Sequence, residues 1–349
     1  MKNNIKQFKV DFIKRIKGVK RVVITSHPTP DEDSMACVLT MRALILKYSP
    51  DARVRVVYAE ETGVRWLGLL GFECVEGCMD MDVVLRGADT LIIVDANNYP
   101  RVGISDEAWD GFEGQTICVD HHEKNESIFD LSYIDHTATS VVEILYTIFY
   151  VDEQIIPREI ADLLLLGILG DTGLLSLISQ SSVDVLKVVH RLVSESGADI
   201  ADLQSRHFRH PLKSLEVLRD GFAHIEVLNN TAGGTCLALY ISNSIYESTG
   251  LSSAEINHAK DYLITKHSGM FEGVTWGFIV YPHVDGTPNV SFRSRHEGVD
   301  VRAMIDKLGL QGGGHAWASG AEFGDGPKTS EEAYSELIRR LKEKNIITS

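Results

Sequence analysis

Three polar side chains stand directly after a short apolar segment, Thr116–Val119. This segment is partly β-branched and follows the turn-forming Glu113-Gly114, which predicts a buried strand. Asp120, His121 and His122 would emerge at its carboxyl end, where open α/β sheets bind ligands. Carboxylates and imidazoles bind divalent metals, and adjacent side chains of an extended segment point in opposite directions. One histidine can therefore bind a metal while the other faces a substrate.

A second cluster follows the predicted strand Arg21–Ser26. His27, Asp31 and Asp33 occur in a loop that two prolines keep out of regular helix. A His-x3-Asp-x-Asp pattern at a strand end favours metal binding over a purely structural loop. Either Asp33 or Ser34 is expected to cap the helix that follows.

Two more carboxylates complete the pattern. Asp95 ends the apolar segment Thr90–Val94, and Asp171 stands between Gly170 and Gly173, where glycine permits close backbone approach. Six ligand-type residues then lie on four segments: His27, Asp31, Asp33, Asp95, His121 and Asp171. This set suits two divalent ions that share one bridging carboxylate, and ions about 3.5–4 Å apart can generate a hydroxide nucleophile at a phosphoryl group. Without a cation, so many carboxylates would repel one another.

The elements that position these residues follow from the spacing of apolar residues. In the N-terminal half, apolar strands alternate with segments of helical spacing, which predicts an α/β fold with a mostly parallel sheet flanked by helices. A further strand is expected at Arg53–Tyr58, and the expected helices are Met35–Tyr48, Val64–Phe72, Val141–Tyr150 and Ile155–Leu169. Trp66 is expected in the core, and base stacking by its ring is the less favoured alternative.

The C-terminal half predicts a second, smaller α/β domain. Its expected strands are Phe222–Leu228, Thr235–Ile241, Val274–Tyr281 and Asn289–Arg293, and its expected helices are Ser252–His267 and Val299–Leu308. We therefore expect a metal-binding domain at residues 1–195, a linker at 196–214 and a substrate-binding domain at 215–349. A site between the two would close about Ser194–Pro211.

Two motifs of this second domain suit an anionic substrate. Gly312-Gly313-Gly314 offers backbone amides at close range, and the adjacent His315 adds a hydrogen bond. Arg293 and Arg295 share one side of an extended segment, from which a guanidinium grips phosphate with two hydrogen bonds.

Composition limits the class of protein. The 349 residues carry 49 acidic against 34 basic side chains, a net charge of −15, which argues against a protein that coats long nucleic acid. No apolar run suggests a membrane span. The five cysteines are scattered, which indicates free thiols in a reducing cytoplasm. Half a zinc site at Cys74 and Cys78 is disfavoured because no second pair at zinc spacing accompanies them.

As a set, these motifs resemble the DHH phosphoesterase family from roughly Lys20 to Gly324. The resemblance implies one metal ion at His27, Asp31 and Asp95, and a second at Asp33, Asp95, His121 and Asp171, with Asp95 bridging. It also implies that His122 contacts the substrate phosphate and that Asp120 orients its neighbours. Two divalent ions are implied, manganese first and magnesium as the alternative. In the C-terminal half, the resemblance is to the DHHA1 domain, with Arg293, Arg295, Gly313, Gly314 and His315 as substrate-binding residues in an interdomain cleft.

Size places the resemblance closest to the stand-alone nano-RNases, which are NrnA-like oligoribonucleases. The implied activity is two-metal hydroxide attack on oligoribonucleotides of a few nucleotides, releasing mononucleotides, together with phosphatase activity on 3′-phosphoadenosine 5′-phosphate. Hydrolysis of cyclic di-AMP or its linear product pApA, hydrolysis of pyrophosphate, and a non-catalytic nucleotide sensor stay open as alternatives. A homodimer is also left open, and neither long nucleic acid nor a membrane is expected as a partner.

Overall fold

The computed structural model describes most of the chain. The described residues are 5–77, 79–122, 128–209, 211–232, 234–251, 253–267, 271–283, 286–294, 299–314, 316–324 and 326–348. The chain divides into two compact units, Met1–Arg209 and His210–Ser349. The division falls inside the segment 196–214 that the sequence marks as a linker, although part of that segment forms helix α8 (Ile200–His207).

The N-terminal unit is built on a sheet of six parallel strands. In sequence order they are β1 (Arg21–Thr25), β2 (Arg53–Val57), β3 (Val75–Glu76), β4 (Thr90–Val94), β5 (Gln115–Asp120) and β6 (Leu131–Ile134). Their order across the sheet is β3-β2-β1-β4-β5-β6. The predicted α/β class with a parallel sheet is therefore confirmed, and the strands are apolar on both faces because helices cover both.

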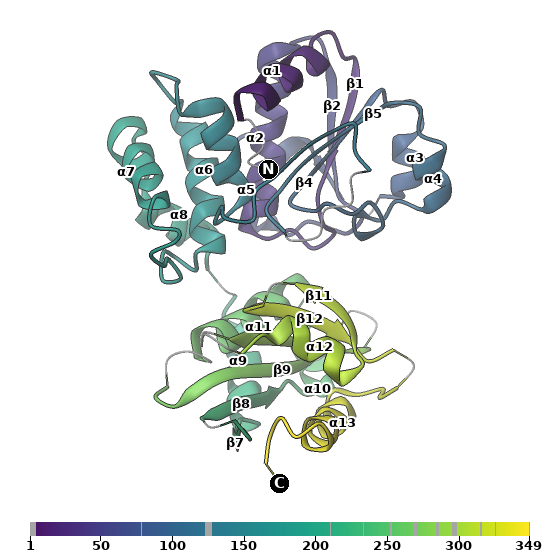
Figure 1. Ribbon diagram of the computed structural model, residues 1–349, viewed down its shortest axis with the longest axis vertical. Coiled ribbons are helices and arrows are strands. Elements are labelled where there is room, and N and C mark those ends of the chain that lie inside the picture. The colour runs from purple at the N-terminus through teal and green to yellow at the C-terminus, as the bar shows by residue number, and fades with distance from the viewer. Residues whose placement is uncertain are drawn as a thin grey trace. The chain divides into compact units, whose positions relative to one another are not determined.

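Successive residues of each strand face opposite layers of helices. Ile24 and Ile92 pack toward one layer, and Val23 and Leu91 pack toward the other. The first layer contains α1 (Ile5–Ile16), α2 (Glu32–Tyr48), α5 (Val141–Leu145), α6 (Arg158–Asp171), α7 (Val185–Ser196) and α8. The second contains α3 (Met81–Leu85), η3 (Pro100–Val102) and α4 (Asp106–Asp110), with α3 and α4 on the right of the sheet in Figure 1.

The strand order reverses beside β1, because the chain moves outward to β2 on one side and to β4 on the other. At such a switch point the loops that leave the two central strands diverge and open a crevice at their carboxyl ends. His27 follows β1 and Asp95 follows β4, so both lie at this crevice.

The expected helix over Val64–Phe72 is wrong. The structure has two short turns instead, η1 (Val64–Trp66) and η2 (Phe72–Cys74). Gly68 and Gly71 between them have φ of 88° and 83°, which ends regular helix. Trp66 is 1% exposed and packs in the core, as expected.

The C-terminal unit contains a second six-stranded sheet, which is mixed. Its strands are β7 (Glu226–Asn229), β8 (Thr235–Tyr240), β9 (Val274–Pro282), β10 (Pro288–Ser294), β11 (Gln311–Gly314) and β12 (Ala318–Glu322), in the order β11-β12-β10-β9-β8-β7. Only the β8–β9 pair is parallel among the described strand pairs of this sheet.

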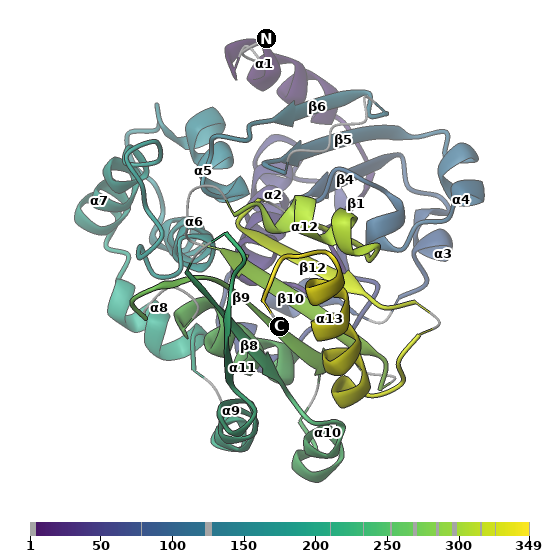
Figure 2. The ribbon, with the colours of Figure 1, turned by 60° about the horizontal axis from the view of Figure 1, so that its bottom comes forward.

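Helices cover both faces of this sheet. α9 (Ser214–Ala223), α10 (Asn243–Thr249) and α11 (Ser253–His267) lie on one face, and α12 (Val301–Leu308) and α13 (Ser330–Glu343) lie on the other. Figure 2 shows α13 in front of the sheet and α11 behind it. The expected strand at Phe222–Leu228 is wrong in its first part, because α9 continues to Ala223. Gly312–Gly314, which the sequence assigns to no strand, pairs with β12 as part of the edge strand β11.

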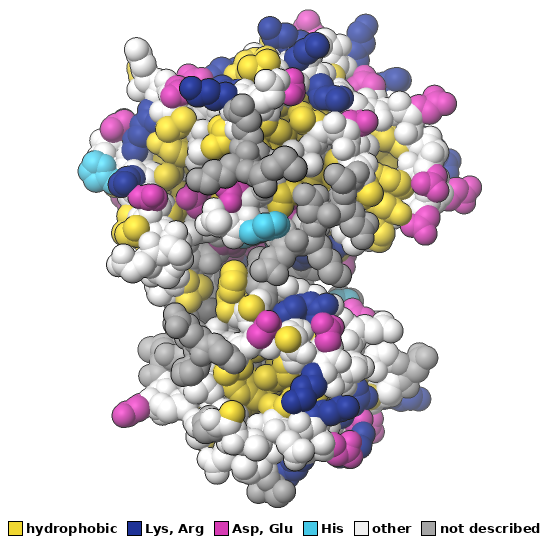
Figure 3. Space-filling view, in the orientation of Figure 1, with side chains coloured by type: hydrophobic (Ala, Val, Ile, Leu, Met, Phe, Trp, Pro, Cys, Tyr) yellow, Lys and Arg dark blue, Asp and Glu magenta, His cyan; other side chains and the backbone are white. Residues whose placement is uncertain are grey.

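The surface mixes charges of both signs. In Figure 3, described basic side chains lie among acidic ones on the visible face of each unit and do not gather into one extended strip. Among the described residues, no helix has both the length and the apolar composition needed to cross a membrane.

Two isoleucines of the N-terminal unit test the burial of the central strands. Ile92 in β4 is 0% exposed and Ile155 is 82% exposed. We expect Ile92→Ala to lower the free energy of unfolding by about 2–5 kcal/mol, because it leaves a cavity between sheet and helices. The matched Ile155→Ala should change it by no more than about 0.5 kcal/mol. Urea denaturation measures both, and equal losses would contradict the assigned core.

Candidate metal centre

His27 and Asp31 meet at the end of β1. The Nε2 atom of His27 lies 3.2 Å from Oδ2 of Asp95 and 3.6 Å from Oδ2 of Asp31. The other oxygen of Asp31 accepts a hydrogen bond of 2.9 Å from the backbone N–H of Ser34. Asp31 is therefore the N-cap of α2, and the expectation that Asp33 or Ser34 caps this helix is wrong. One carboxylate thus both caps a helix and faces His27.

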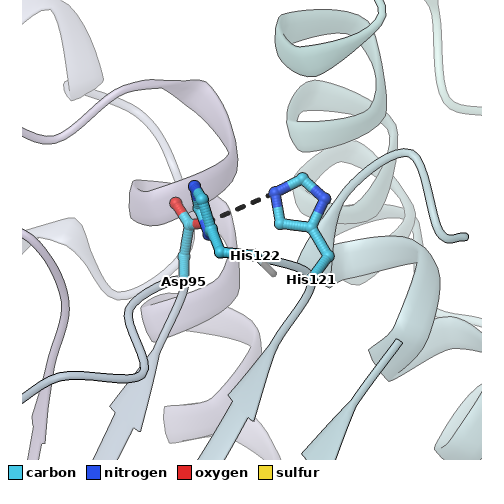
Figure 4. A group of neighbouring side chains, drawn as sticks. All are labelled: Asp95, His121 and His122. Atoms are coloured by element: carbon cyan, nitrogen blue, oxygen red, sulfur yellow. Dashed lines mark ion pairs between the residues drawn. The ribbon is translucent and has the colours of Figure 1, made fainter. Parts of the chain in front are cut away.

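Asp95 occupies a left-handed backbone conformation at the end of β4, with φ of 53°. Its backbone N–H donates to the carbonyl of Val119 on the neighbouring strand, at 3.1 Å. Its Oδ2 faces His27, and its Oδ1 lies 3.7 Å from Nε2 of His121 and 3.7 Å from Nδ1 of His122 (Figure 4). The two oxygens of one carboxylate therefore face two different sets of side chains.

Asp120 fixes both histidines that follow it. It is 0% exposed, and its Oδ1 accepts the backbone N–H of His121 at 2.7 Å and lies 2.8 Å from Nδ1 of His122. The Nδ1 atom of His121 lies 3.3 Å from the carbonyl of Ala138. A proton on that Nδ1 leaves the Nε2 lone pair of His121 facing the carboxylates, which is the form that binds a metal.

Asp33 and Asp171 lie on the other side of His121. Asp33 is 0% exposed, and its carboxylate accepts the backbone N–H groups of Val141 and Val142, at 2.6 and 3.0 Å, in the first turn of α5. The positive end of the short helix favours a carboxylate there. Asp171 ends α6 and places Oδ2 3.5 Å from Nε2 of His121.

Charge crowding shifts the pKa values of these groups in the metal-free protein. Burial and the charge of Asp95 raise the pKa of Asp33 well above its usual range. Burial and the charge of Asp33 do the same to the pKa of Asp171. Burial by itself would lower the pKa of His27, but Asp31 and Asp95 outweigh it and raise that pKa to about 10. Protons therefore occupy a cluster whose unshielded charges would repel one another.

The structure brings all six predicted ligand residues together. Three overlapping groups have ligand atoms within 4.8 Å of one another and could hold a metal ion: His27, Asp31 and Asp95; Asp33, His121 and Asp171; and Asp95, His121 and His122. Oxygen and imidazole nitrogen donors of this kind suit hard or borderline divalent cations. Each carboxylate oxygen that accepts a backbone hydrogen bond keeps a second lone pair for an ion.

The sequence does not predict several groups that hydrogen-bond to the site residues. The amide Nδ2 of Asn97 donates to the carbonyl of His122 at 3.2 Å, although nothing in the sequence distinguishes this residue from a turn-forming asparagine. The carbonyl of Ala138 and the N–H groups of Val141 and Val142 are backbone atoms and leave no residue signature. The closest sequence signal to these atoms is the expected helix Val141–Tyr150.

The predicted substrate-binding residues of the C-terminal unit are described in part. Arg293 in β10 lies 3.3 Å from Oδ1 of Asp261 and donates to the carbonyl of Phe292 at 2.9 Å. Gly313 and Gly314 are exposed in the edge strand β11. Arg295 and His315 lie outside the described residues.

The sequence is similar to known proteins. Residues 21–168 match the model of the DHH family, N-terminal domain. The chain is 28% identical to the probable bifunctional oligoribonuclease and PAP phosphatase NrnA of Streptococcus mutans, over 94% of this chain and 97% of that protein. It is 23% identical to the bifunctional oligoribonuclease and PAP phosphatase NrnA of Bacillus subtilis, over 90% and 93% of the two chains.

Solved structures show the same fold. An exopolyphosphatase-related protein from Bacteroides fragilis superposes with a TM-score of 0.78 at 18% identity, covering 97% of this chain and 96% of that one. RecJ of Thermus thermophilus, in complex with Mn²⁺, superposes with a TM-score of 0.54 at 12% identity, covering 98% of this chain and 54% of that one.

Metal binding should release protons near neutral pH. His27 carries a proton at pH 7 because its pKa is raised to about 10, and it must lose that proton to bind an ion. We therefore expect the affinity for Mn²⁺ to increase as the pH rises toward 10. Calorimetric titration in Pipes and in Tris measures the released protons, and His27→Gln should release about one fewer, while the exposed His190→Gln should match the wild type. Identical heats in both buffers, after correction for dilution, would contradict this account.

A glycine on α6 should prove necessary for the position of Asp33. A Cβ at Gly167 would lie 2.7 Å from Oδ1 of Asp33 and 2.6 Å from Cγ2 of Val142, whereas a Cβ at Gly63 would meet nothing within 4 Å. We expect Gly167→Ala to destabilise the protein by about 1–3 kcal/mol through overpacking and to weaken Mn²⁺ binding. Gly63→Ala is the control, and thermal unfolding with and without Mn²⁺ measures both effects. Wild-type behaviour of Gly167→Ala would show that Asp33 is not confined as described.

Proposed function

Since this chain belongs to the DHH family and is a phosphoesterase, we propose that it hydrolyses oligoribonucleotides of a few nucleotides to mononucleotides. We further propose a second activity, removal of the 3′-phosphate from 3′-phosphoadenosine 5′-phosphate. The names of the two NrnA relatives support both substrates.

The observation that carries the proposal is the position of Asp95 between two groups of donors. Its Oδ2 faces His27 and its Oδ1 faces His121. We propose that His27, Asp31 and Asp95 hold one divalent ion and that Asp33, Asp95, His121 and Asp171 hold a second. Manganese is the first choice and magnesium the alternative. When bound, such a pair lowers the pKa of water to give a nucleophile and neutralises charge on the phosphoryl group.

His122 has a separate role in this proposal. Its Nδ1 is held by Asp120 at 2.8 Å, which orients the ring and places Nε2 on the opposite side. The contact with Asp120 raises the pKa of His122 against the lowering effect of burial, so that the ring can carry a proton. We propose that Nε2 of His122 donates to a non-bridging oxygen of the substrate phosphate. Asp120 is then a positioning residue, because it acts through His122.

The surface charge suits a short substrate. A net charge of −15 opposes long polyanions, whereas a short oligonucleotide needs only a local cationic contact. We propose that Arg293, Arg295, Gly313, Gly314 and His315 supply that contact from the C-terminal unit. Cys37, Cys74, Cys118 and Cys236 are free thiols, and we propose a reducing cytoplasm as the site of the reaction.

A substrate panel tests the function directly. Full-length protein with Mn²⁺ is given a 5′-phosphorylated RNA dinucleotide, 3′-phosphoadenosine 5′-phosphate, cyclic di-AMP, pApA and pyrophosphate. The proposal predicts fast release of mononucleotides from the RNA dinucleotide and turnover of 3′-phosphoadenosine 5′-phosphate. Turnover of cyclic di-AMP or pyrophosphate alone would overturn the substrate assignment.

The same assay tests the role of Asp95. Asp95→Asn keeps the size of the side chain and tolerates the left-handed backbone. We expect kcat to fall about 10³-fold or more, because the charge between the two donor groups is lost. Asp110→Asn, at an exposed position of α4, is the matched control and should retain wild-type kcat. An Asp95→Asn variant within tenfold of wild type would contradict the bridging role.

A further inference from the structure

The C-terminal unit contains a buried lysine that the proposed function does not use. Lys260 of α11 is 6% exposed, although lysine is almost never fully buried unless it is paired. Its Nζ lies 2.9 Å from Oδ1 of Asp261 and 3.3 Å from Oγ of Ser291 on β10, and 4.6 Å from the centre of the Tyr281 ring. Two of the three ammonium donors therefore have oxygen acceptors, and the ring contributes a cation–π contact. Since its side chain is buried by these neighbours, Lys260 acts on a ligand through them.

The oxygen that Lys260 contacts is also the oxygen that Arg293 contacts. The Nη2 atom of Arg293 lies 3.3 Å from Oδ1 of Asp261, whose side chain is 45% exposed. Two cations therefore share one carboxylate oxygen. Arg293 uses one further donor on the carbonyl of Phe292, so contacts among the described residues occupy only two of its five N–H donors.

The sheet surface beside this triad is open. One row across the sheet contains Ser291 of β10, Gly320 of β12 and Gly313 of β11. Arg293 lies two residues from Ser291 and shares its face. A Cβ built on Gly313 would meet nothing within 4 Å. The sheet face that carries Ser291 and Arg293 therefore leaves room for a ligand over Gly313.

We propose that Lys260 is a positioning residue for the phosphate contact of Arg293. Lys260 neutralises Asp261, and the guanidinium of Arg293 consequently keeps its charge and its unused donors for a phosphate group of the substrate. Without Lys260, the charge of Asp261 would act more strongly on Arg293 and compete with that phosphate. This inference rests on the proposed function, because the phosphate is one of a short RNA.

Variants of the full-length protein separate this role from a structural one. Lys260→Met keeps the length and burial of the side chain, and we expect it to raise KM for a 5′-phosphorylated RNA dinucleotide about tenfold with kcat within about twofold of wild type. Adding Asp261→Asn should return KM to within about threefold of wild type, because the competing charge is gone. Hydrolysis of bis(p-nitrophenyl) phosphate, which lacks a 5′-phosphate, should not change. Lys307→Met, at an exposed position of α12, is the control.

The outcomes remain distinct if the substrate is wrong or a variant fails to fold. The same variants are titrated calorimetrically with 5′-AMP, so the Kd ratios test Lys260 even when the dinucleotide is not hydrolysed and the proposed function fails. If Lys260→Met does not fold, the single variant Asp261→Asn tests the inference. The proposal predicts that its KM and Kd are lower than those of the wild type. A purely structural role of Asp261 predicts that they are higher. An unchanged KM and Kd in Lys260→Met, or a double variant as weak as the single one, would overturn the inference.

Discussion

The N-terminal unit depends on one carboxylate held in an unfavourable backbone conformation. Asp95 has φ of 53°, a conformation that costs a non-glycine residue on the order of 1–3 kcal/mol. The hydrogen bond from its N–H to Val119 and the packing of β4 between two helical layers maintain it. This conformation directs the carboxylate into the crevice at the switch point of the sheet. There one of its oxygens faces His27 and the other faces His121.

The rest of the site compensates for the crowding that this position creates. Asp33 gains two backbone N–H donors from α5, Asp31 gains one from its own helix, and Asp120 is held by both histidines. Gly167 keeps α6 close enough for Asp171 to reach the same cluster. Even so, the pKa values of Asp33 and Asp171 stay raised by burial and by neighbouring charge. A metal-free cluster of this kind is a strained state that divalent cations would relieve.

The sequence predicts that the six ligand-type residues gather in one place, because most of them lie at or near a strand or helix end that apolar spacing marks. Asp95 and His121 come directly after β4 and β5, and His27 comes two residues after the end of β1. Parallel strands bring their carboxyl ends to one edge. The sequence does not predict those features that tertiary contacts or backbone geometry determine. The turns around Gly68 replace an expected helix, and β11 pairs as a strand although glycine has low strand propensity. The carbonyl of Ala138 supports His121 through an atom that every residue possesses.

The central claim is that Asp95 joins two metal ions. A crystal structure of the full-length protein soaked with Mn²⁺, with anomalous data collected at the manganese edge, tests this most directly. The account predicts two anomalous peaks about 3.5–4 Å apart, one beside His27 and Asp31 and the other beside His121 and Asp171, with an oxygen of Asp95 at each. A single peak, or peaks that Asp95 does not contact, would contradict it.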